Sequence, residues 1–191
     1  MEPKPELRRR ILVARDTLSP AARAARSAQA GEHLFSAPEV AAAGTLMFFA
    51  SFGGEIATRP MLARALAQGK RLALPRVDRA SRRLAPHLVR DPEAELAPGF
   101  YGIPEPRPES PLIVLDDIEV VIVPGVAWGE DGFRVGYGGG FYDRFLPTVP
   151  QARRVGLAFE LQVLPSVPHG AHDLPVHLLV TEAGVRRFPP A

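Results

Sequence analysis

The residues best suited to chemistry lie in one short segment, where glycine occupies positions 136, 138, 139 and 140. A buried strand is predicted over residues 119–124, and the helix-like segment FYDRFL follows the glycines. Glycine is less favourable than alanine in regular structure by about 0.5 to 1 kcal/mol per residue, so four glycines in five positions indicate that the backbone there requires glycine. Backbone N–H groups without side chains can converge on an anion at the start of a helix. The segment therefore predicts a phosphate-binding loop, with a flexible surface turn as the alternative.

Polar residues around this loop suit the same chemistry. Arg134 precedes the glycines and offers a guanidinium fork to phosphate oxygens. Asp143 falls in the first turn of the predicted helix, where a carboxylate suits either a Mg²⁺ that bridges phosphates or the helix terminus alone. Tyr142 is either a site hydroxyl or a core residue. Neither GxxxxGK[ST] nor GxGxxG is present, which indicates a different nucleotide-binding family.

The elements around the loop predict the scaffold that holds it. Helical spacing of apolar residues over 7–18 and the Ser19-Pro20 start signal predict two N-terminal helices, and a further helix is expected over 58–68. Strands alternating with helices imply an α/β fold, a three-layer αβα arrangement with a mainly parallel central sheet. We expect a single domain over residues 1–191. Short apolar runs predict buried strands at residues 45–50, 71–75, 119–124, 153–159 and 177–181.

Prolines crowd residues 91–111, and this segment shows no sustained hydrophobic period. Long loops in compact domains are often functional, and disorder is the alternative explanation. Phe100, Tyr101 and Ile103 offer apolar anchors within the segment. We therefore expect an ordered surface excursion or a lid.

Composition narrows the class of protein. The chain has 191 residues, no cysteine and a formal net charge of +2. The lack of cysteine excludes disulfides, thiolate ligands and a cysteine nucleophile, and it fits a reducing compartment, so we expect a cytoplasmic protein. The sequence shows no secretory apolar region and no apolar run near the roughly 18 residues of a membrane span, so no membrane role is expected. The arginine-rich stretches lack accompanying aromatics, so we expect no nucleic-acid partner.

Residues 124–146 closely resemble the signature of the 5-formyltetrahydrofolate cyclo-ligase family, in which Pro-Gly and a variable loop precede Arg-x-Gly-x-Gly-x-Gly-aromatic-Tyr-Asp. Three positions depart from the usual pattern, but none removes an expected ligand. They are Phe141 in place of tyrosine, Val135 in place of leucine and His177 in place of an acidic residue. Further matches follow in the family's order, at Lys4 to Arg8, residues 55–58, residues 74–76 and residues 101–106.

The resemblance implies a role for each matching residue. Lys4 and Arg8 would contact ATP phosphates, although an amphipathic helix alone would explain them as solvated charges. Glu55 would hold the pterin end of a folate, and its alternative role is to begin a helix. Tyr101 would lie near the folate, as would Tyr137 and Phe141. The implied ATP-binding loop comprises Arg134, Gly136, Tyr137, Gly138, Gly139, Gly140, Phe141 and Tyr142, and the implied magnesium ligands are Asp143 and Asp173.

Three histidines near the C-terminus, His169, His172 and His177, look like a metal cluster. Glycine and proline separate them, and the Mg²⁺ that the resemblance implies prefers oxygen ligands. We therefore expect none of the three to bind the metal.

The reaction that the resemblance implies is the ATP- and Mg²⁺-dependent cyclisation of 5-formyltetrahydrofolate to 5,10-methenyltetrahydrofolate, with release of ADP and phosphate. No Ser/His/Asp motif is present, so we expect catalysis by positioning and phosphate electrostatics, without a catalytic protein nucleophile. The partners would be small molecules, and a monomer is expected. Two other classes stay open: a non-catalytic nucleotide or phosphosugar binding protein on the same scaffold, and an RNA-associated protein with steeply salt-dependent binding.

Overall fold

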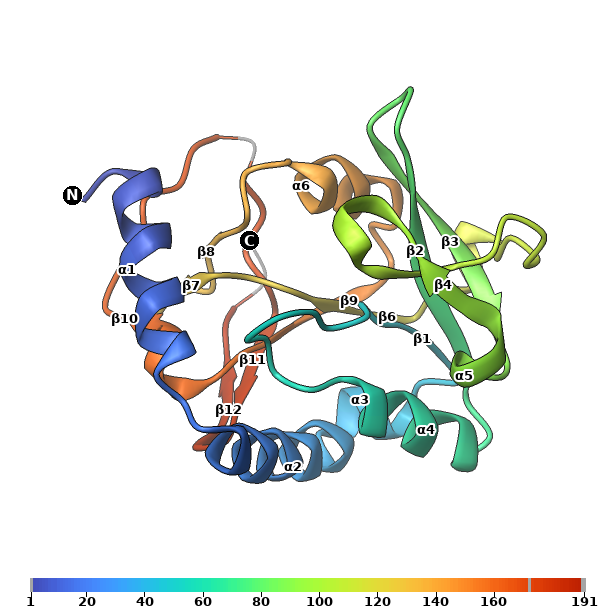
Figure 1. The fold of residues 1–191 in the computed structure, drawn as a ribbon, viewed down its shortest axis with the longest axis horizontal. Coiled ribbons are helices and arrows are strands. Elements are labelled where there is room, and N and C mark those ends of the chain that lie inside the picture. The colour runs from blue at the N-terminus through green and yellow to red at the C-terminus, as the bar shows by residue number, and fades with distance from the viewer. Residues whose placement is uncertain (1, 172, 190–191) are drawn as a thin grey trace.

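A seven-stranded sheet runs through the middle of the molecule, in the order β12-β11-β9-β6-β1-β2-β3 (Figure 1). The structure is a computed structural model and describes residues 2–171 and 173–189. The strands from β11 to β2 are parallel, and β12 and β3 pair antiparallel at the two edges. The predicted α/β fold with a mainly parallel sheet is therefore confirmed. The strands are β1 (Thr45–Met47), β2 (Arg71–Asp78), β3 (Arg83–Val89), β6 (Val120–Val123), β9 (Arg153–Leu157), β11 (Leu178–Thr181) and β12 (Gly184–Arg187).

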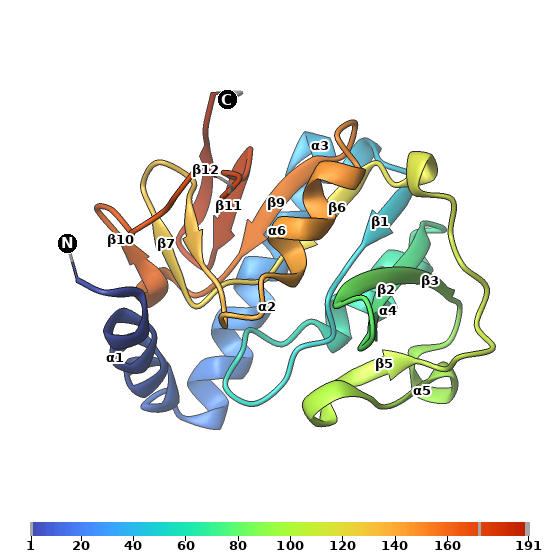
Figure 2. The same ribbon diagram turned by 90° about the horizontal axis from the view of Figure 1, so that it is seen from above.

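Helices cover both faces of this sheet (Figure 2). One face packs against α2 (Pro20–Ser36), α3 (Pro38–Ala42) and α4 (Arg59–Ala67). The other carries the short α6 (Phe141–Phe145) and the 3₁₀ turn η3 (Leu146–Thr148). Every residue of β1, β6 and β11 is buried, because alternate side chains enter opposite covered faces. The three-layer arrangement is confirmed, with one layer much thinner than the other.

Helix α1 (Lys4–Asp16) stands apart from the main layers and packs on a small three-stranded sheet. That sheet has the order β10-β7-β8, with β7 (Ala127–Gly129), β8 (Arg134–Val135) and β10 (Val163–Leu164). Leu7 and Ile11 are each 2% exposed and lie in one apolar cluster with Val135. This contact matters because β8 leads directly into the glycine loop, so α1 and the loop are held together.

The ends of the predicted helices agree with their sequence signals. The Ser19 Oγ accepts a hydrogen bond from the Ala22 backbone N–H at 3.1 Å, which caps α2. Helix α4 follows Thr58 and ends before Gly69, whose φ of 74° is in the left-handed region. The strand predicted over residues 45–50 ends early, at Met47.

The proline-rich segment over residues 91–111 is ordered, as predicted. It folds against the β2–β3 hairpin, and β5 pairs antiparallel with β4. Whether it closes over a ligand stays a prediction. Its elements are α5 (Pro92–Glu95), β4 (Leu96–Pro98), the 3₁₀ turn η1 (Phe100–Gly102) and β5 (Pro104–Pro106), and two further 3₁₀ turns, η2 (Leu115–Asp117) and η4 (Glu160–Gln162), follow later in the chain.

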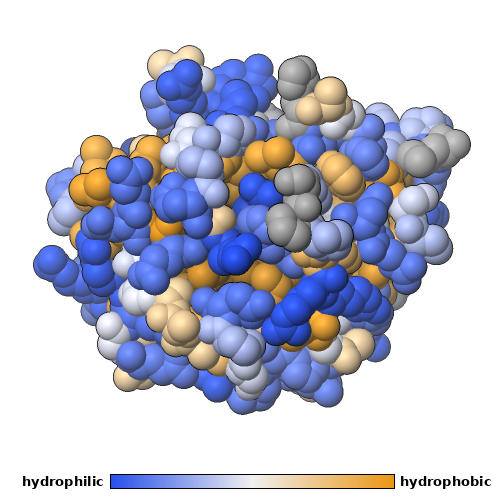
Figure 3. Space-filling view, turned by 180° about the vertical axis from the view of Figure 1, so that it is seen from behind, coloured by the Kyte–Doolittle hydropathy of each residue, from blue (hydrophilic) through white to orange (hydrophobic). Residues whose placement is uncertain are grey.

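Hydrophilic side chains cover most of the face seen from behind, with hydrophobic ones in small groups between them (Figure 3). Within residues 2–171 and 173–189, no helix combines the length and the apolar character that a bilayer crossing requires.

Candidate active site

The glycine loop joins β8 to α6 and adopts a backbone that side chains would oppose. Gly138 has a φ of 100° and Gly140 a φ of 66°, both in the region that favours glycine. A Cβ at Gly139 would lie 2.7 Å from the Phe141 ring, whereas a Cβ at Gly136 would meet nothing within 4 Å. The side-chain direction at position 136 is therefore open. Because α6 has only five residues, its dipole is small, and neighbouring cations must supply most of the positive charge.

Helix α1 brings two of those cations to the loop. Lys4 and Arg8 are four residues apart and thus lie on one helical face. The Arg8 Nε donates to the Gly136 carbonyl oxygen at 2.6 Å, and its guanidinium carbon is 3.5 Å from where a Gly138 Cβ would be. The Lys4 Nζ lies 2.9 Å from the Asp173 Oδ2. Both side chains therefore contact predicted site residues and are more than solvated surface charges.

Arg134 is buried and forms an ion pair with Asp143, while the charge of Asp173 lies nearby. It is 5% exposed, and its Nη2 donates to the Asp143 Oδ1 at 2.5 Å. Its Nη1 donates to the Leu174 carbonyl oxygen at 3.2 Å. Burial lowers the pKa of Arg134, while the nearby charges of Asp143 and Asp173 oppose that shift. The guanidinium is thus committed largely to internal contacts, and direct binding of phosphate by Arg134 stays a prediction.

Asp143 and Asp173 are the two carboxylates that could hold a metal. Burial favours the neutral form of Asp173, but hydrogen bonds from Lys4 and the Gly170 N–H and the charge of Arg134 outweigh it and lower its pKa. The Asp143 side chain is 35% exposed and uses one oxygen for Arg134. Two carboxylates with oxygens left over fit a Mg²⁺ bound mainly by phosphates and water. Among the described residues no group of three acidic, histidine or cysteine side chains forms a cage for a metal.

Glu55 forms a second, buried corner of the site. It is 6% exposed, its Oε2 accepts from the Phe52 backbone N–H at 3.0 Å, and its Oε1 accepts from the Tyr137 hydroxyl at 2.7 Å. The Arg15 Nη1 donates to the same hydroxyl at 2.9 Å. Burial raises the pKa of Glu55, and the hydrogen bonds from Tyr137 and Phe52 and the charge of Arg15 counteract that rise. Through Tyr137, the glycine loop and the carboxylate share one site.

The hydroxyl of Tyr142 lies between the two corners. The ring packs against both apolar cores, which supports the core interpretation of this residue. Its hydroxyl is buried and has no hydrogen-bond partner among the described residues. Burial raises the pKa of Tyr142, the charge of Glu55 raises it further, and Arg134 acts in the opposite direction. The hydroxyl therefore lies near both charges, enclosed by protein and without a described partner.

Phe100 lies closer to the glycine loop than Tyr101, the aromatic residue that the sequence singled out. Its ring centroid is 6.0 Å from that of Phe141, in an edge-to-face arrangement, and Arg79 lies 5.3 Å from its ring. Tyr101 is 85% exposed, has a φ of 55°, and packs against Phe100 in a tilted arrangement with ring centroids 4.2 Å apart. Contact between Tyr101 and the folate therefore stays a prediction.

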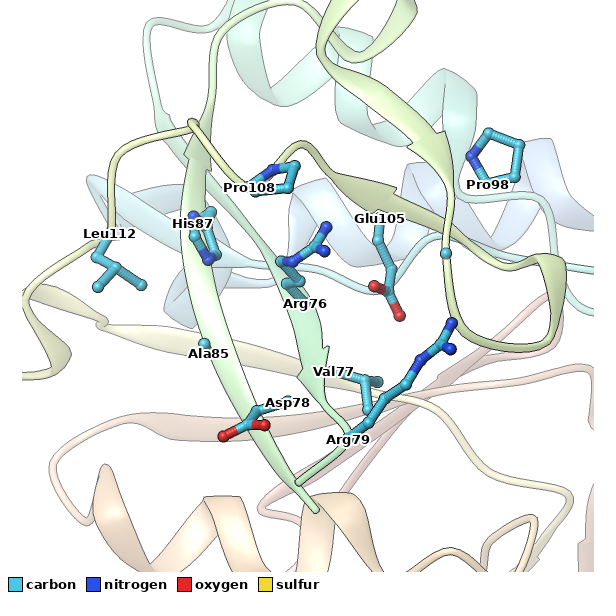
Figure 4. A pocket seen from close by; sticks show the side chains of 11 residues that line it. Arg76, Val77, Asp78, Arg79, Ala85, His87, Pro98, Glu105, Pro108 and Leu112 are labelled. Atoms are coloured by element: carbon cyan, nitrogen blue, oxygen red, sulfur yellow. The ribbon is translucent and has the colours of Figure 1, made fainter. Parts of the chain in front are cut away.

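A cavity of about 600 Å³ lies away from this site, between the β2–β3 hairpin and the β4–β5 segment (Figure 4). Its polar lining residues already have protein partners. Arg76 donates to the Pro106 carbonyl oxygen at 2.9 Å, the His87 Nδ1 lies 2.6 Å from the Ser110 oxygen, and Glu105 accepts from the Phe100 N–H. These groups hold the proline-rich segment against the hairpin, so we interpret the cavity as a gap between two packed segments and not as a second binding site.

The histidines take part in other contacts. His169 stacks on Phe133 with ring centroids 3.7 Å apart. The His177 Nδ1 accepts from the Arg154 backbone N–H at 2.9 Å, and burial, with the charges of Arg154 and Arg153, lowers the pKa of His177 to about 4. His172 lies outside the described residues.

Arg15, Phe52, Phe100 and Arg144 were missed by the sequence reasoning. Arg15 had a usable signal, because Leu7, Ile11 and Arg15 form the buried stripe of α1 at i, i+4 and i+8. A cation at a position where an apolar residue is expected indicates a buried partner. Arg144 donates to the Gly139 and Arg82 carbonyl oxygens at 2.8 and 2.9 Å and so ties the loop to the hairpin. Nothing local in the sequence indicates that contact.

The open parallel sheet, the cation-flanked glycine loop and the adjacent buried carboxylate define a class of protein, an α/β protein that binds a phosphorylated ligand beside a second small molecule. The sequence profile of the 5-formyltetrahydrofolate cyclo-ligase family matches residues 1–182. The chain belongs to this family, as its loop sequence predicted.

Individual relatives agree with this assignment. The 5-formyltetrahydrofolate cyclo-ligase of Escherichia coli is 33% identical over 174 residues, which cover 90% of this chain and 96% of that protein. The mouse protein of the same name is 28% identical over 149 residues, 72% of each chain. The 5,10-methenyltetrahydrofolate synthetase of Aquifex aeolicus has a TM-score of 0.86 and 35% identity, covering 98% of this chain and 94% of that one. The synthetase from Mycoplasma pneumoniae, at 19% identity and a TM-score of 0.76 over 95% and 99% of the chains, shows the shared fold alone.

Proposed function

We propose that this protein uses ATP and Mg²⁺ to convert 5-formyltetrahydrofolate into 5,10-methenyltetrahydrofolate, with release of ADP and phosphate. Family membership supports the reaction and favours it over a non-catalytic nucleotide-binding protein. One observation carries the assignment of the site: Tyr137, within the glycine loop, donates a hydrogen bond to Glu55 at 2.7 Å. A phosphate-binding loop and a carboxylate that can recognise a pterin therefore lie side by side, as transfer between two bound substrates requires.

The reaction explains why a phosphate site is needed. The formyl group is attached to N5 through its carbon, and its oxygen must leave that carbon as N10 closes the ring. An amide-like oxygen is a poor leaving group. Transfer of the ATP γ-phosphoryl group to that oxygen forms one P–O bond and releases ADP. N10 then bonds to the formyl carbon, loses its proton, and phosphate departs with the former formyl oxygen. The protein supplies positioning and charge neutralisation, and no protein nucleophile is needed.

The residues of this chain divide this work between them. Lys4 and Arg8 would neutralise phosphate oxygens, and Arg8 already contacts the Gly136 carbonyl oxygen of the loop. Asp143 and Asp173 would hold Mg²⁺, which when bound neutralises charge between the phosphates. Lys4 would then leave Asp173 for a phosphate oxygen. The buried Arg134 would hold Asp143 in place, and the Gly170 N–H would hold Asp173.

The folate would lie between Glu55 and the Phe141 ring. The amide N–H and the amino group of a pterin are adjacent donors, and an ionised carboxylate is an acceptor-only group that matches them. Phe100 and Phe141 would contact the flat part of the substrate. The buried, unpartnered Tyr142 hydroxyl would donate to a formyl or phosphate oxygen once substrate binding exposes it.

The remaining expectations go with this proposal. Residues 1–191 would act as one catalytic domain, as a monomer, with small molecules as partners and no nucleic acid. We propose the cytoplasm as its compartment, because the chain contains no cysteine and its substrates are intracellular metabolites.

The direct test mixes purified protein, MgCl₂, ATP and 5-formyltetrahydrofolate and follows the methenyl chromophore. Omission of ATP, or removal of Mg²⁺ with a chelator, should abolish the signal. The exposed Arg10→Gln variant should retain the wild-type rate, since Arg10 pairs only with Glu2 on the surface. Binding of ATP without loss of formylfolate would overturn the proposal in favour of a nucleotide-binding protein.

A further inference from the structure

Three side chains form a hydrogen-bonded series with a fixed direction. The Arg15 Nη1 donates to the Tyr137 hydroxyl oxygen at 2.9 Å, and that hydroxyl donates to the Glu55 Oε1 at 2.7 Å. A guanidinium can only donate hydrogen bonds. The phenol oxygen must therefore accept from Arg15, and its one proton points at Glu55. Without Arg15 the hydroxyl could rotate or accept from another group.

Arg15 is buried beside this series. It is 4% exposed on the stripe of α1 that also buries Leu7 and Ile11, and its guanidinium lies 5.9 Å from the Tyr137 ring centroid. A Cβ at Gly54 would come within 3.2 Å of the Arg15 Nε, so the glycine next to Glu55 lets the guanidinium approach the loop. Burial of a charge costs free energy unless the charge is paired and hydrogen-bonded, so a buried arginine next to this loop indicates a role there.

The series acts on the state of Glu55. Burial of this carboxyl raises its pKa, whereas the Tyr137 hydrogen bond and the Arg15 charge act in the opposite direction. Both contributions favour the ionised form, which accepts through both oxygens and donates through none. Tyr137 holds one of those oxygens and the Phe52 N–H holds the other. Orientation and ionisation of Glu55 are thus set together.

We propose that Arg15 is a positioning residue for folate recognition, which through the Tyr137 hydroxyl aims Glu55 at the N–H donors of the pterin. The inference rests on the proposed function, because Glu55 is taken as the pterin-binding residue. Arg15 lies on the same helix as Lys4 and Arg8, so α1 contributes to both substrate sites. We expect its effect to fall mainly on the folate, because the hydrogen bond of its side chain goes to the Tyr137 hydroxyl, which in turn donates to Glu55.

The test measures 5-formyltetrahydrofolate binding by isothermal titration calorimetry without ATP, in wild type, Arg15→Gln, Tyr137→Phe and the double variant. Each single change should weaken folate binding by about tenfold or more, as expected for loss of a hydrogen bond to a charged group. The double variant should bind no more weakly than the weaker single variant, because both changes break one series. The Kd for ATP should stay within about threefold throughout. Arg10→Gln, on the same helix, is the matched control and should bind as wild type does.

The possible outcomes separate three explanations. Wild-type folate affinity in Arg15→Gln would overturn the proposal. Additive losses in the double variant would also overturn it, since Arg15 would then contact the folate independently. A parallel loss of ATP affinity or a large fall in unfolding temperature in Arg15→Gln would indicate a structural role for Arg15. Tyr137→Phe, which removes only one hydroxyl, would then decide: weakened folate binding supports the proposal, and normal folate binding overturns it. If wild type itself binds no formylfolate, the proposed function fails.

Discussion

Replacing Glu55 with glutamine separates recognition from stability at this site. The substitution keeps the shape of the side chain and removes its charge. Glu55 is 6% exposed, and its two oxygens accept from the Tyr137 hydroxyl and the Phe52 N–H. A glutamine can still accept from Phe52 through its oxygen and donate to the phenol oxygen through its amide group. The fold should therefore tolerate it.

The expected loss of affinity follows from the charge. A carboxylate can accept from two adjacent pterin donors, while a glutamine has one acceptor and presents an N–H₂ group to the other donor. The loss of one hydrogen bond to a charged group is about 1.5 to 3 kcal/mol, or roughly 10- to 150-fold in Kd. ATP affinity should change little, because the Lys4 and Arg8 contacts are untouched.

Glu55→Gln should weaken folate binding but stabilise the folded protein, and the gain in stability should depend on pH. Burial is the main reason why the pKa of Glu55 is raised above the ordinary value for a glutamate side chain. Between the unfolded and folded pKa values, the folded protein holds a proton that the unfolded chain has lost. Stability of the wild type therefore falls as pH rises through that window. The glutamine variant lacks this dependence, so its unfolding temperature relative to wild type should increase as pH rises above about 4.5.

Two measurements check this reasoning. Calorimetric titration gives the Kd for 5-formyltetrahydrofolate, and thermal unfolding at a series of pH values gives the difference in unfolding temperature. Wild-type folate affinity would refute the role of Glu55 as the pterin-binding residue. An unfolding temperature that falls relative to wild type with rising pH would refute the assigned direction of the pKa shift.

Three further changes probe the rest of the site. Asp143→Asn should lower turnover by about a hundredfold or more and raise the Mg²⁺ concentration for half-maximal activity, measured by the methenyl assay, because charge at the phosphates is less well neutralised; unchanged magnesium dependence would remove Asp143 as a ligand. Gly138→Ala should reduce ATP affinity far more than Gly136→Ala does, because of these two glycines only Gly138 has a positive φ, and equal ATP affinity in the two variants would contradict this. Tyr142→Phe should raise the unfolding temperature and lower turnover together, since it removes a buried hydroxyl without a partner, and a loss of stability would show that the hydroxyl is satisfied in the free protein.

The sequence alone predicted the central strands, the helix ends and the glycine loop, because each of these depends on a local pattern of residues. Apolar runs predicted the core strands, and the Ser19 and Gly69 signals placed helix ends that the structure confirms. The glycine run indicated a requirement for glycine, and Gly138 and Gly140 adopt positive φ values that favour it. Motif order was enough for the family, which the comparisons confirm. Strand β1 ended earlier than predicted, because apolar composition continues past its last paired residue.

Only the tertiary structure decided which side chains meet. The Lys4–Asp173 ion pair joins residues 169 apart, and Arg15 reaches Tyr137 over a separation of 122. Phe100, rather than the exposed Tyr101, lies beside Phe141 because the proline-rich segment turns at η1. Residue type sets what a group can do, but burial and partners depend on distant segments of the chain returning to the same place. The sequence therefore identified most of the charged residues of the candidate site. Only the fold showed that Arg134 is buried next to Asp143 and that Arg15 also belongs to the site.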